Sequence, residues 1–263
     1  MSYAKVLCCL LLGGGMSIVR SPGAAADVRD RFEKREYAAA DGAKLPYRLL
    51  KPTNYDPKQN YPLVIFLHGA GERGTDNTRQ LVHGMADFAS DKIMETYPAF
   101  VIAPQCPDDQ QWVDVPWSAD EHQMPERPSA SLRQTLELVA ALQKEFSIDV
   151  GRIYVTGLSM GGFGAWDCIQ RRPELFAAAA PVCGGGDAAL AAEIKDVPVW
   201  AFHGDADGAV KVRRSRDMIA ALKAVGGSPK YTEYKSVGHD SWTATYRNPE
   251  FFEWLFAQQR PAK

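Results

Sequence analysis

The sequence predicts a single α/β domain, with helices on both faces of a mostly parallel sheet. Continuous apolar runs of four to six residues recur along the chain, as in strands that are buried on both faces. Between these runs, apolar residues return every three or four positions, which is typical of amphipathic helices. The 263 residues contain no Ser/Gly-rich linker, internal repeat or charge run at which a second domain would begin.

The first 26 residues are predicted to be a secretory signal peptide. Lys5 precedes an apolar run at residues 6–19, and Ala24 and Ala26 form an Ala-x-Ala cleavage site. The apolar run is shorter than the ~20 residues that span a bilayer. We therefore expect residues 27–263 to form one secreted or periplasmic domain with no membrane span.

The expected domain opens with an antiparallel hairpin of residues 32–39 and 44–50, joined at Asp41-Gly42. The apolar runs that should form the parallel strands are residues 63–67, 100–103, 153–156, 177–182 and 197–202. Ligands bind at the carboxyl ends of the strands in such sheets, so we expect the site at that edge.

The spacing of apolar residues predicts three amphipathic helices, at residues 129–146, 212–225 and 248–256. Gly226-Gly227 ends the second helix, and Asn248-Pro249 is a typical start for the third. A further helix is expected directly after the strand at residues 153–156, in the segment SMGGFGAW.

The formal net charge is only −2, from 30 Lys and Arg residues and 32 Asp and Glu residues. This balance gives no basic surface for nucleic acid or for an anionic membrane. The glycine runs at residues 161–164 and 184–186 lack the G-x-G-x-x-G pattern of dinucleotide-binding folds. We predict no cofactor and no nucleic-acid partner, and the sequence does not fix the oligomeric state.

Three cysteines remain after the predicted signal peptide: Cys106, Cys168 and Cys183. None has C-x-x-C spacing, so no metal site is predicted. Cys168 falls on a predicted helix and is interpreted as a core residue. Cys106 and Cys183 each follow a predicted strand, and a disulfide between them is a hypothesis.

The segment GLSMG at residues 157–161 places a serine between two glycines where a strand gives way to a helix. A side chain on so sharp a turn needs a strained backbone, and neighbouring segments approach so closely that small residues are required two positions before and after it. The turn would expose the Ser159 hydroxyl above the sheet. It would also leave the Met160 N–H at a helix N-terminus, where it can donate to an oxyanion.

In this segment the chain resembles the α/β-hydrolase family, whose nucleophile elbow reads G-x-S-x-G. The resemblance implies that Ser159 is the nucleophile and that an acid and then a histidine follow it in the chain. His239 is the only histidine after the acids that follow residues 197–202, and it is the expected base.

Two aspartates, Asp205 and Asp207, follow that strand in the segment HGDADG, and their positions alone leave the choice of acid open. Related esterases carry H-G-x-x-D with the acid at the last position, which implies that Asp207 pairs with His239. Asp205 would then cap or tighten the loop. Asp187 and Asp240 are poorer candidates because neither follows the right strand.

A second oxyanion donor is expected in the loop LHGAGERG at residues 67–74, which resembles the family's H-G-x-G segment. By that match the Ala70 N–H joins the Met160 N–H in the oxyanion hole. His68 is interpreted as a structural residue that anchors this loop by hydrogen bonds. The remaining histidines, interpreted as surface or packing residues, are His83, His122 and His203.

Three tryptophans lie in irregular segments where a substrate pocket would be built: Trp112, Trp117 and Trp242. Aromatic rings in such positions can hold an aryl or acyl group or stack on a sugar. The alternative is that these rings only pack the loops.

The resemblance covers nearly the whole chain after residue 26. The segments PQCPDDQQW, SMGGFGAW, CGGGD and GHDSW are similar to compact secreted carboxylesterases of the polyhydroxyalkanoate depolymerase, feruloyl esterase and acetylxylan esterase branch, and more distantly to prolyl-oligopeptidase catalytic domains. This implies a serine carboxylic-ester hydrolase that works through an acyl-enzyme on small acyl, aryl or carbohydrate-linked esters. The alternatives are a serine peptidase without a propeller, an acyltransferase, and a non-catalytic binding module on a hydrolase scaffold.

Overall fold

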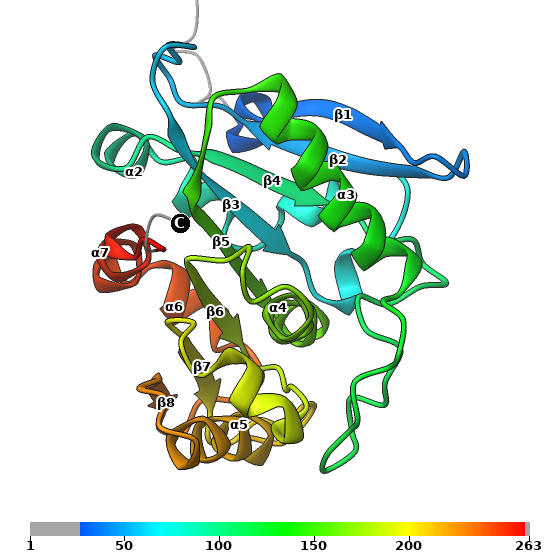
Figure 1. Ribbon diagram of the computed structural model, residues 1–263, viewed down its shortest axis with the longest axis vertical. Coiled ribbons are helices and arrows are strands. Elements are labelled where there is room, and N and C mark those ends of the chain that lie inside the picture. Colours follow the sequence, from blue (N-terminus) through cyan, green and yellow to red (C-terminus); the bar gives the residue numbers. More distant parts are fainter. Residues whose placement is uncertain (1–26, 261–263) are drawn as a thin grey trace, which may run out of the picture.

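The computed structural model describes residues 27–260 (Figure 1), so the predicted signal peptide lies outside the described residues. Eight strands form one sheet in the order β1-β2-β4-β3-β5-β6-β7-β8. β1 (Glu33–Ala38) and β2 (Lys44–Leu50) form the predicted antiparallel hairpin, and β2 is also antiparallel to β4. All other neighbouring strands are parallel, which confirms the predicted mostly parallel sheet.

Strands and helices alternate along the chain after the hairpin. The remaining strands are β3 (Tyr61–Leu67), β4 (Phe100–Pro104), β5 (Ile148–Leu158), β6 (Ala178–Val182), β7 (Trp200–Gly204) and β8 (Lys230–Tyr234). The helices are α1 (Met85–Phe88), α2 (Asp91–Thr96), α3 (Ala130–Glu145), α4 (Met160–Arg171), α5 (Arg213–Ala224), α6 (Trp242–Tyr246) and α7 (Pro249–Ala257). The three predicted amphipathic helices correspond to α3, α5 and α7.

Helices cover both faces of the sheet (Figure 1). Side chains of β3 alternate between two hydrophobic clusters: Leu63 and Ile65 belong to one, and Val64 and Phe66 to the other. α3, α4 and α5 contribute to the first cluster, and α1, α2, α6 and α7 contribute to the second. Because every residue of β3 is buried, this strand lies in the centre of the domain.

Several strands differ from the predicted ranges, and β5 begins at Ile148 rather than at residue 153. β7 begins at Trp200 rather than at residue 197, because Pro198 has no N–H to donate and only an isolated bridge joins Ala179 to Val199. β8 is an additional edge strand that the sequence does not predict. Its residues, KYTEY, are half-buried or exposed, so it lacks the continuous apolar run of the central strands.

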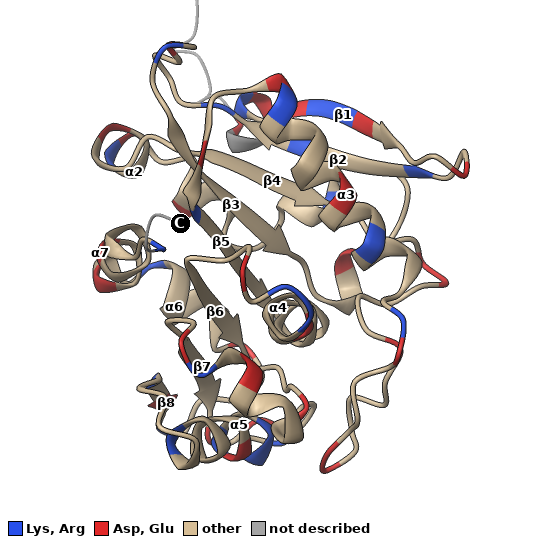
Figure 2. Ribbon diagram, in the orientation of Figure 1, with Lys and Arg blue, Asp and Glu red and all other residues tan. Residues whose placement is uncertain are grey.

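Charged residues lie on β1, on the helices and in the loops, as the coloured ribbon of Figure 2 shows. β1 reads EKREYA, and β8, at the other edge of the sheet, contains Lys230 and Glu233. The inner strands β3, β4, β6 and β7 contain no charged residue. Within residues 27–260, no helix combines the length and the apolar character that a membrane crossing requires.

The disulfide hypothesis is wrong, because Cys106 and Cys183 are free thiols on opposite faces of the sheet. Cys106 belongs to the cluster that includes α3, and its Sγ lies 3.4 Å from the Ser131 hydroxyl oxygen. Cys183 belongs to the cluster that includes α6 and α7. Cys168 is a buried free thiol in α4, as predicted.

The turn from β5 into α4 passes very close to the carboxyl end of β3. A Cβ atom at Gly157 would lie 2.6 Å from the Leu67 carbonyl oxygen, and a Cβ atom at Gly161 would overlap the same carbonyl group. Contacts this short are strongly repulsive, so any side chain at these positions would force β3 and α4 apart. The two glycines that the turn was predicted to need are required by this packing.

Replacing Gly161 with alanine should lower the free energy of unfolding by about 1–3 kcal/mol, because the added methyl group overpacks the contact with β3. Gly208→Ala is the matched control, since a Cβ atom at Gly208 meets nothing within 4 Å. Its effect should stay within about 0.5 kcal/mol. Urea denaturation followed by circular dichroism measures both values, and equal unfolding midpoints for the two variants would contradict the packing argument.

Candidate active site

Ser159 occupies the apex of the turn between β5 and α4. Its φ of 53° and ψ of −117° are unusual for a residue with a side chain. The Ser159 N–H donates to the Val182 carbonyl at the end of β6 (2.9 Å), and the Phe163 N–H donates to the Ser159 carbonyl (3.1 Å). These two bonds fix the strained turn at the carboxyl edge of the sheet.

Three loops bring the predicted nucleophile, base and acid together at this edge: Ser159 follows β5, Asp207 follows β7 and His239 follows β8. His239 Nε2 lies 2.9 Å from Ser159 Oγ, and His239 Nδ1 lies 2.7 Å from Asp207 Oδ2. An ionised carboxylate only accepts, so this bond requires the proton on Nδ1. Nε2 is then free to accept the proton of the serine hydroxyl.

The Asp207 carboxylate is fully buried but well supplied with donors. Its Oδ1 accepts from the N–H groups of Ala209 (2.8 Å) and Val210 (2.9 Å). Burial alone would raise the pKa of Asp207, but the hydrogen bonds from His203, His239 and these backbone groups outweigh it and hold the pKa well below its ordinary value. The Asp207 carboxylate is therefore ionised, as its predicted role as the partner of a protonated histidine requires.

His203 supports Asp207, a contact that goes beyond the packing role expected for it. This fully buried side chain places Nε2 3.2 Å from Asp207 Oδ2 and 3.0 Å from the Val210 carbonyl oxygen. Its Nδ1 lies 2.8 Å from the Ser215 hydroxyl at the start of α5. The sequence feature that could have indicated this contact is the position of His203 as the last side chain of β7, in the same HGDAD segment as Asp207.

Asp205 points away from this series and supports its loop instead. Its Oδ1 accepts a hydrogen bond from the Ser236 N–H (2.6 Å), which ties the loop after β7 to the turn after β8. The structure thus brings Asp207 rather than Asp205 to His239. Asp187 and Asp240 each bind a backbone N–H in the helix that follows them, at Ala189 and Thr243.

The predicted oxyanion loop is anchored by His68. Its Nε2 accepts from the Cys106 N–H (3.0 Å), and its Nδ1 lies 2.6 Å from the Gly69 carbonyl oxygen. Burial lowers the pKa of His68 to about 4, so the ring is neutral and serves as a fixed structural support. Arg73 Nε donates to the Ala70 carbonyl (3.0 Å), which holds the expected oxyanion residue from its other side.

Both expected oxyanion donors lie in first turns of helices. Met160 is the first residue of α4, and Ala70 is the first residue of the 3-10 helix η2 (Ala70–Glu72). The first N–H groups of a helix have no intrahelical acceptor. The N–H groups of Ala70 and Met160 are therefore suited to donate hydrogen bonds to a negatively charged oxygen.

The three tryptophans expected near substrate occupy different environments. Trp112 does not meet the expectation: it is fully buried, and its Nε1 donates to the His68 carbonyl (3.0 Å), so it packs the oxyanion loop. Trp117 is half-buried, and the Arg73 guanidinium lies 6.0 Å from its ring centre. Trp242 is half-buried and stands edge-on to the His239 ring, with 5.2 Å between ring centres.

Among residues 27–260, the group that offers three candidate metal ligands within 4.8 Å of one another is Cys183, Asp207 and His239. Two of these are the predicted acid and base, already hydrogen-bonded to each other. Burial raises the pKa of the Cys183 thiol to about 12, which disfavours the thiolate that a metal would need. The arrangement therefore fits the proton-transfer series better than a resident metal.

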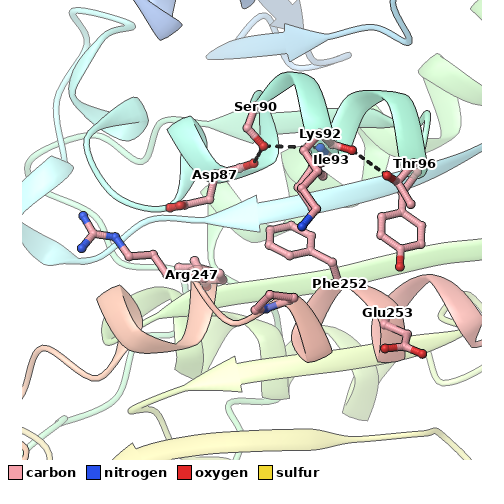
Figure 3. A pocket seen from close by; sticks show the side chains of 11 residues that line it. Asp87, Ser90, Lys92, Ile93, Thr96, Arg247, Phe252 and Glu253 are labelled. Carbon is pink, nitrogen blue, oxygen red and sulfur yellow. Dashed lines mark hydrogen bonds between the residues drawn. The ribbon is translucent and has the colours of Figure 1, made fainter.

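A separate cavity of about 400 Å³ lies between α1 and α2 on one side and α6 and α7 on the other (Figure 3). Asp87, Ile93, Arg247 and Phe252 are among its lining residues, and none of the predicted site residues is. The Ser90 hydroxyl drawn in Figure 3 donates to the Asp87 carbonyl (2.8 Å) and caps α2. This cavity is therefore distinct from the cluster around Ser159.

A family model matches the part of the chain that contains this site. The Esterase family model matches residues 39–248, a range that contains Ser159, Asp207 and His239. The chain belongs to the esterase family. A bifunctional acetylxylan esterase/xylanase from Neocallimastix patriciarum is 23% identical to this esterase over 201 residues, which are 76% of this chain and 27% of that protein. The esterase chain thus spans about a quarter of the length of the first curated relatives that it matches.

Solved structures share the fold of this esterase. A thermostable esterase superposes with a TM-score of 0.82 at 42% identity, covering 89% of this chain and 64% of that one. The feruloyl esterase module of Clostridium thermocellum, solved with sinapinate, has a TM-score of 0.65 at 15% identity and covers 93% of this chain and 96% of its own. At such low identity the similarity shows the fold alone, and peptidases share it as well. The family match over residues 39–248 therefore shows membership of the esterase family.

Because of Asp207, the free energy of unfolding should decrease as the pH falls into the acid range. Because folding holds its pKa below the ordinary value of 3.8, the unfolded chain binds this proton more readily. The stabilisation is complete above the unfolded pKa and is lost as the pH falls towards the folded pKa, at up to about 1.4 kcal/mol per pH unit. Between about pH 6 and pH 3, urea unfolding should show a larger loss for the wild type than for Asp207→Asn. Equal losses would contradict this assignment.

Proposed function

We propose that this esterase is a serine hydrolase that acts through an acyl-enzyme. The observation that carries the proposal is the hydrogen-bonded series of Ser159, His239 and Asp207, with distances of 2.9 and 2.7 Å. Such a series activates a serine hydroxyl, because the imidazole accepts its proton and the carboxylate stabilises the resulting imidazolium. The reaction requires no cofactor.

In the first half-reaction, Ser159 Oγ attacks the ester carbonyl carbon while its proton passes to His239 Nε2. The N–H groups of Ala70 and Met160 donate to the oxyanion that forms. The carbonyl then re-forms, the bond to the alcohol oxygen breaks, and His239 gives its proton to the departing alcohol.

In the second half-reaction, His239 accepts a proton from water while the water oxygen attacks the acyl carbon. Collapse of this second intermediate breaks the bond to Ser159 Oγ and returns the proton to the serine. The products are the free acid and the regenerated enzyme.

We propose small acyl, aryl or carbohydrate-linked esters as the substrates, hydrolysed outside the cytoplasm. The half-buried Trp242 beside His239 offers an apolar ring where an acyl or aryl group can pack. Similar proteins are an acetylxylan esterase/xylanase and a feruloyl esterase module. The predicted signal peptide supports export, and one relative is described as a secreted protein.

Other activities would use the same side chains. A serine peptidase would attack an amide, and an acyltransferase would pass the acyl group to an alcohol instead of water. A non-catalytic binding module would have no need of a nucleophile, base and acid in hydrogen-bonding register. The substrate and the acceptor therefore separate these alternatives.

Ser159→Ala should lower kcat for p-nitrophenyl acetate and butyrate by about 10⁴-fold or more, because the acyl-enzyme can no longer form. Ser118→Ala, at an exposed serine, is the matched control and should leave the rate unchanged. Methyl ferulate, a peptide p-nitroanilide and an added alcohol complete the panel. Equal activity of Ser159→Ala and wild type would exclude the serine mechanism. Cleavage of the anilide alone would favour the peptidase, and transfer to the alcohol would favour the acyltransferase.

A further inference from the structure

A second pair of an acid and a histidine lies beside the Ser159 series. Glu72 ends the short helix η2 of the oxyanion loop, and its side chain is only 12% exposed. His83 Nε2 lies 3.4 Å from Glu72 Oε1, and the His83 side chain is one-third exposed. The pair connects the oxyanion loop to the turn that precedes α1.

His83 also reaches His239 through one aromatic ring. The centre of its imidazole lies 5.3 Å from the centre of the Trp242 ring, at an interplanar angle of 53°. Trp242 in turn stands edge-on to His239, at 5.2 Å and 89°. A continuous series of contacts therefore runs from Glu72 through His83 and Trp242 to His239.

The chain is anchored in the fold at both residues of the pair. Gly84, next to His83, has a φ of 72°, and a Cβ atom there would lie 2.8 Å from the Tyr246 ring and 3.0 Å from the Phe66 ring. The Glu72 carbonyl accepts a hydrogen bond from Gln105 Nε2 (3.1 Å). Because the backbone at neither residue can shift freely, the contact between Glu72 and His83 sets the distance between the oxyanion loop and the turn that precedes α1.

The groups around His83 favour its protonated form. The hydrogen bond to Glu72 raises the pKa of His83, burial opposes it, and the charges of Glu72 and Asp240 raise it further. Asp240 lies in the turn before α6, where its carboxylate binds the Thr243 N–H and hydroxyl. The nearby His68 is kept neutral by burial. The ion pair therefore exists while His83 is protonated and is lost as the pH rises.

We propose that Glu72 and His83 are a positioning pair for the hydrolytic reaction: they hold the oxyanion loop and the Trp242 ring in place against His239. This rests on the proposed function, in which His239 is the base and Ala70 an oxyanion donor. Glu72 lies two residues after Ala70, so displacement of Glu72 would move that donor. A small misplacement of such groups slows the chemical step more than it weakens substrate binding.

The first test is kinetic. Glu72→Gln and His83→Gln keep side chains that can hydrogen-bond but remove the charges of the pair. Each should lower kcat about 10- to 100-fold with little change in KM. Glu95→Gln, at an exposed glutamate of α2, is the matched control and should leave kcat unchanged. An unchanged kcat in both pair variants, or a change confined to KM, would overturn the proposal.

The second test needs no turnover. In a His239→Asn background, His83 is the described histidine whose ring still contacts Trp242, and a protonated imidazole quenches indole fluorescence. Subtracting the signal of the same protein with Trp242→Phe isolates this tryptophan. Its intensity should titrate with pH, the midpoint should move to lower pH with Glu72→Gln, and His83→Gln should abolish the titration.

Together the two tests distinguish failure of the proposed pairing of Glu72 and His83 from failure of the proposed hydrolytic function. The pairing would be overturned, even in an active enzyme, if Glu72→Gln left the titration midpoint unchanged or if the Trp242 fluorescence still titrated in His83→Gln. The expected titration in a protein whose wild type hydrolyses no ester would support the contact between Glu72, His83 and Trp242. That same result would count against the proposed function.

Discussion

The backbone contact between the end of β3 and the start of α4 is the constraint on which the site depends. Gly157 and Gly161 leave no atom between the α4 turn and the Leu67 carbonyl, so the two segments touch main chain to main chain. Ser159 lies in one segment, and the oxyanion loop begins in the other, at His68. One contact therefore sets both the strained backbone of Ser159 and its distance from Ala70, the proposed second oxyanion donor, before any side chain of the site is considered.

The charge of Asp207, the proposed acid, depends on a different balance, between the cost of desolvation and the gain from hydrogen bonds. A buried carboxylate would ordinarily take up a proton, which would leave His239 without a negative partner. Asp207 stays ionised because two backbone N–H groups and two histidines donate to it. His203 binds both this carboxylate and the first turn of α5 through Ser215, so the helix that follows the loop helps to hold the acid.

The features predictable from the sequence are those with a local cause. The inner strands are buried on both faces and read as apolar runs, and the elbow around Ser159 needs glycines at fixed spacing. The sequence does not predict β8, because this edge strand is half exposed and contains no continuous apolar run. The spacing of residues along the chain does not determine which face of the sheet a loop residue contacts. The separation of Cys106 from Cys183 and the burial of Trp112 therefore could not be predicted from the sequence. The contacts of His203 and His83 are hidden for the same reason.

The charged strands at the two edges of the sheet affect how partly folded chains interact with one another. An edge strand presents unpaired N–H and C=O groups to which another strand can add. β1 lines that edge with consecutive charged residues, Glu33 to Glu36, and β8 places Lys230 and Glu233 along the other. A second copy that paired with either edge would have to bring its own charges into register and strip them of water. Partly folded chains therefore find a poor template for sheet growth, which favours solitary folding over aggregation.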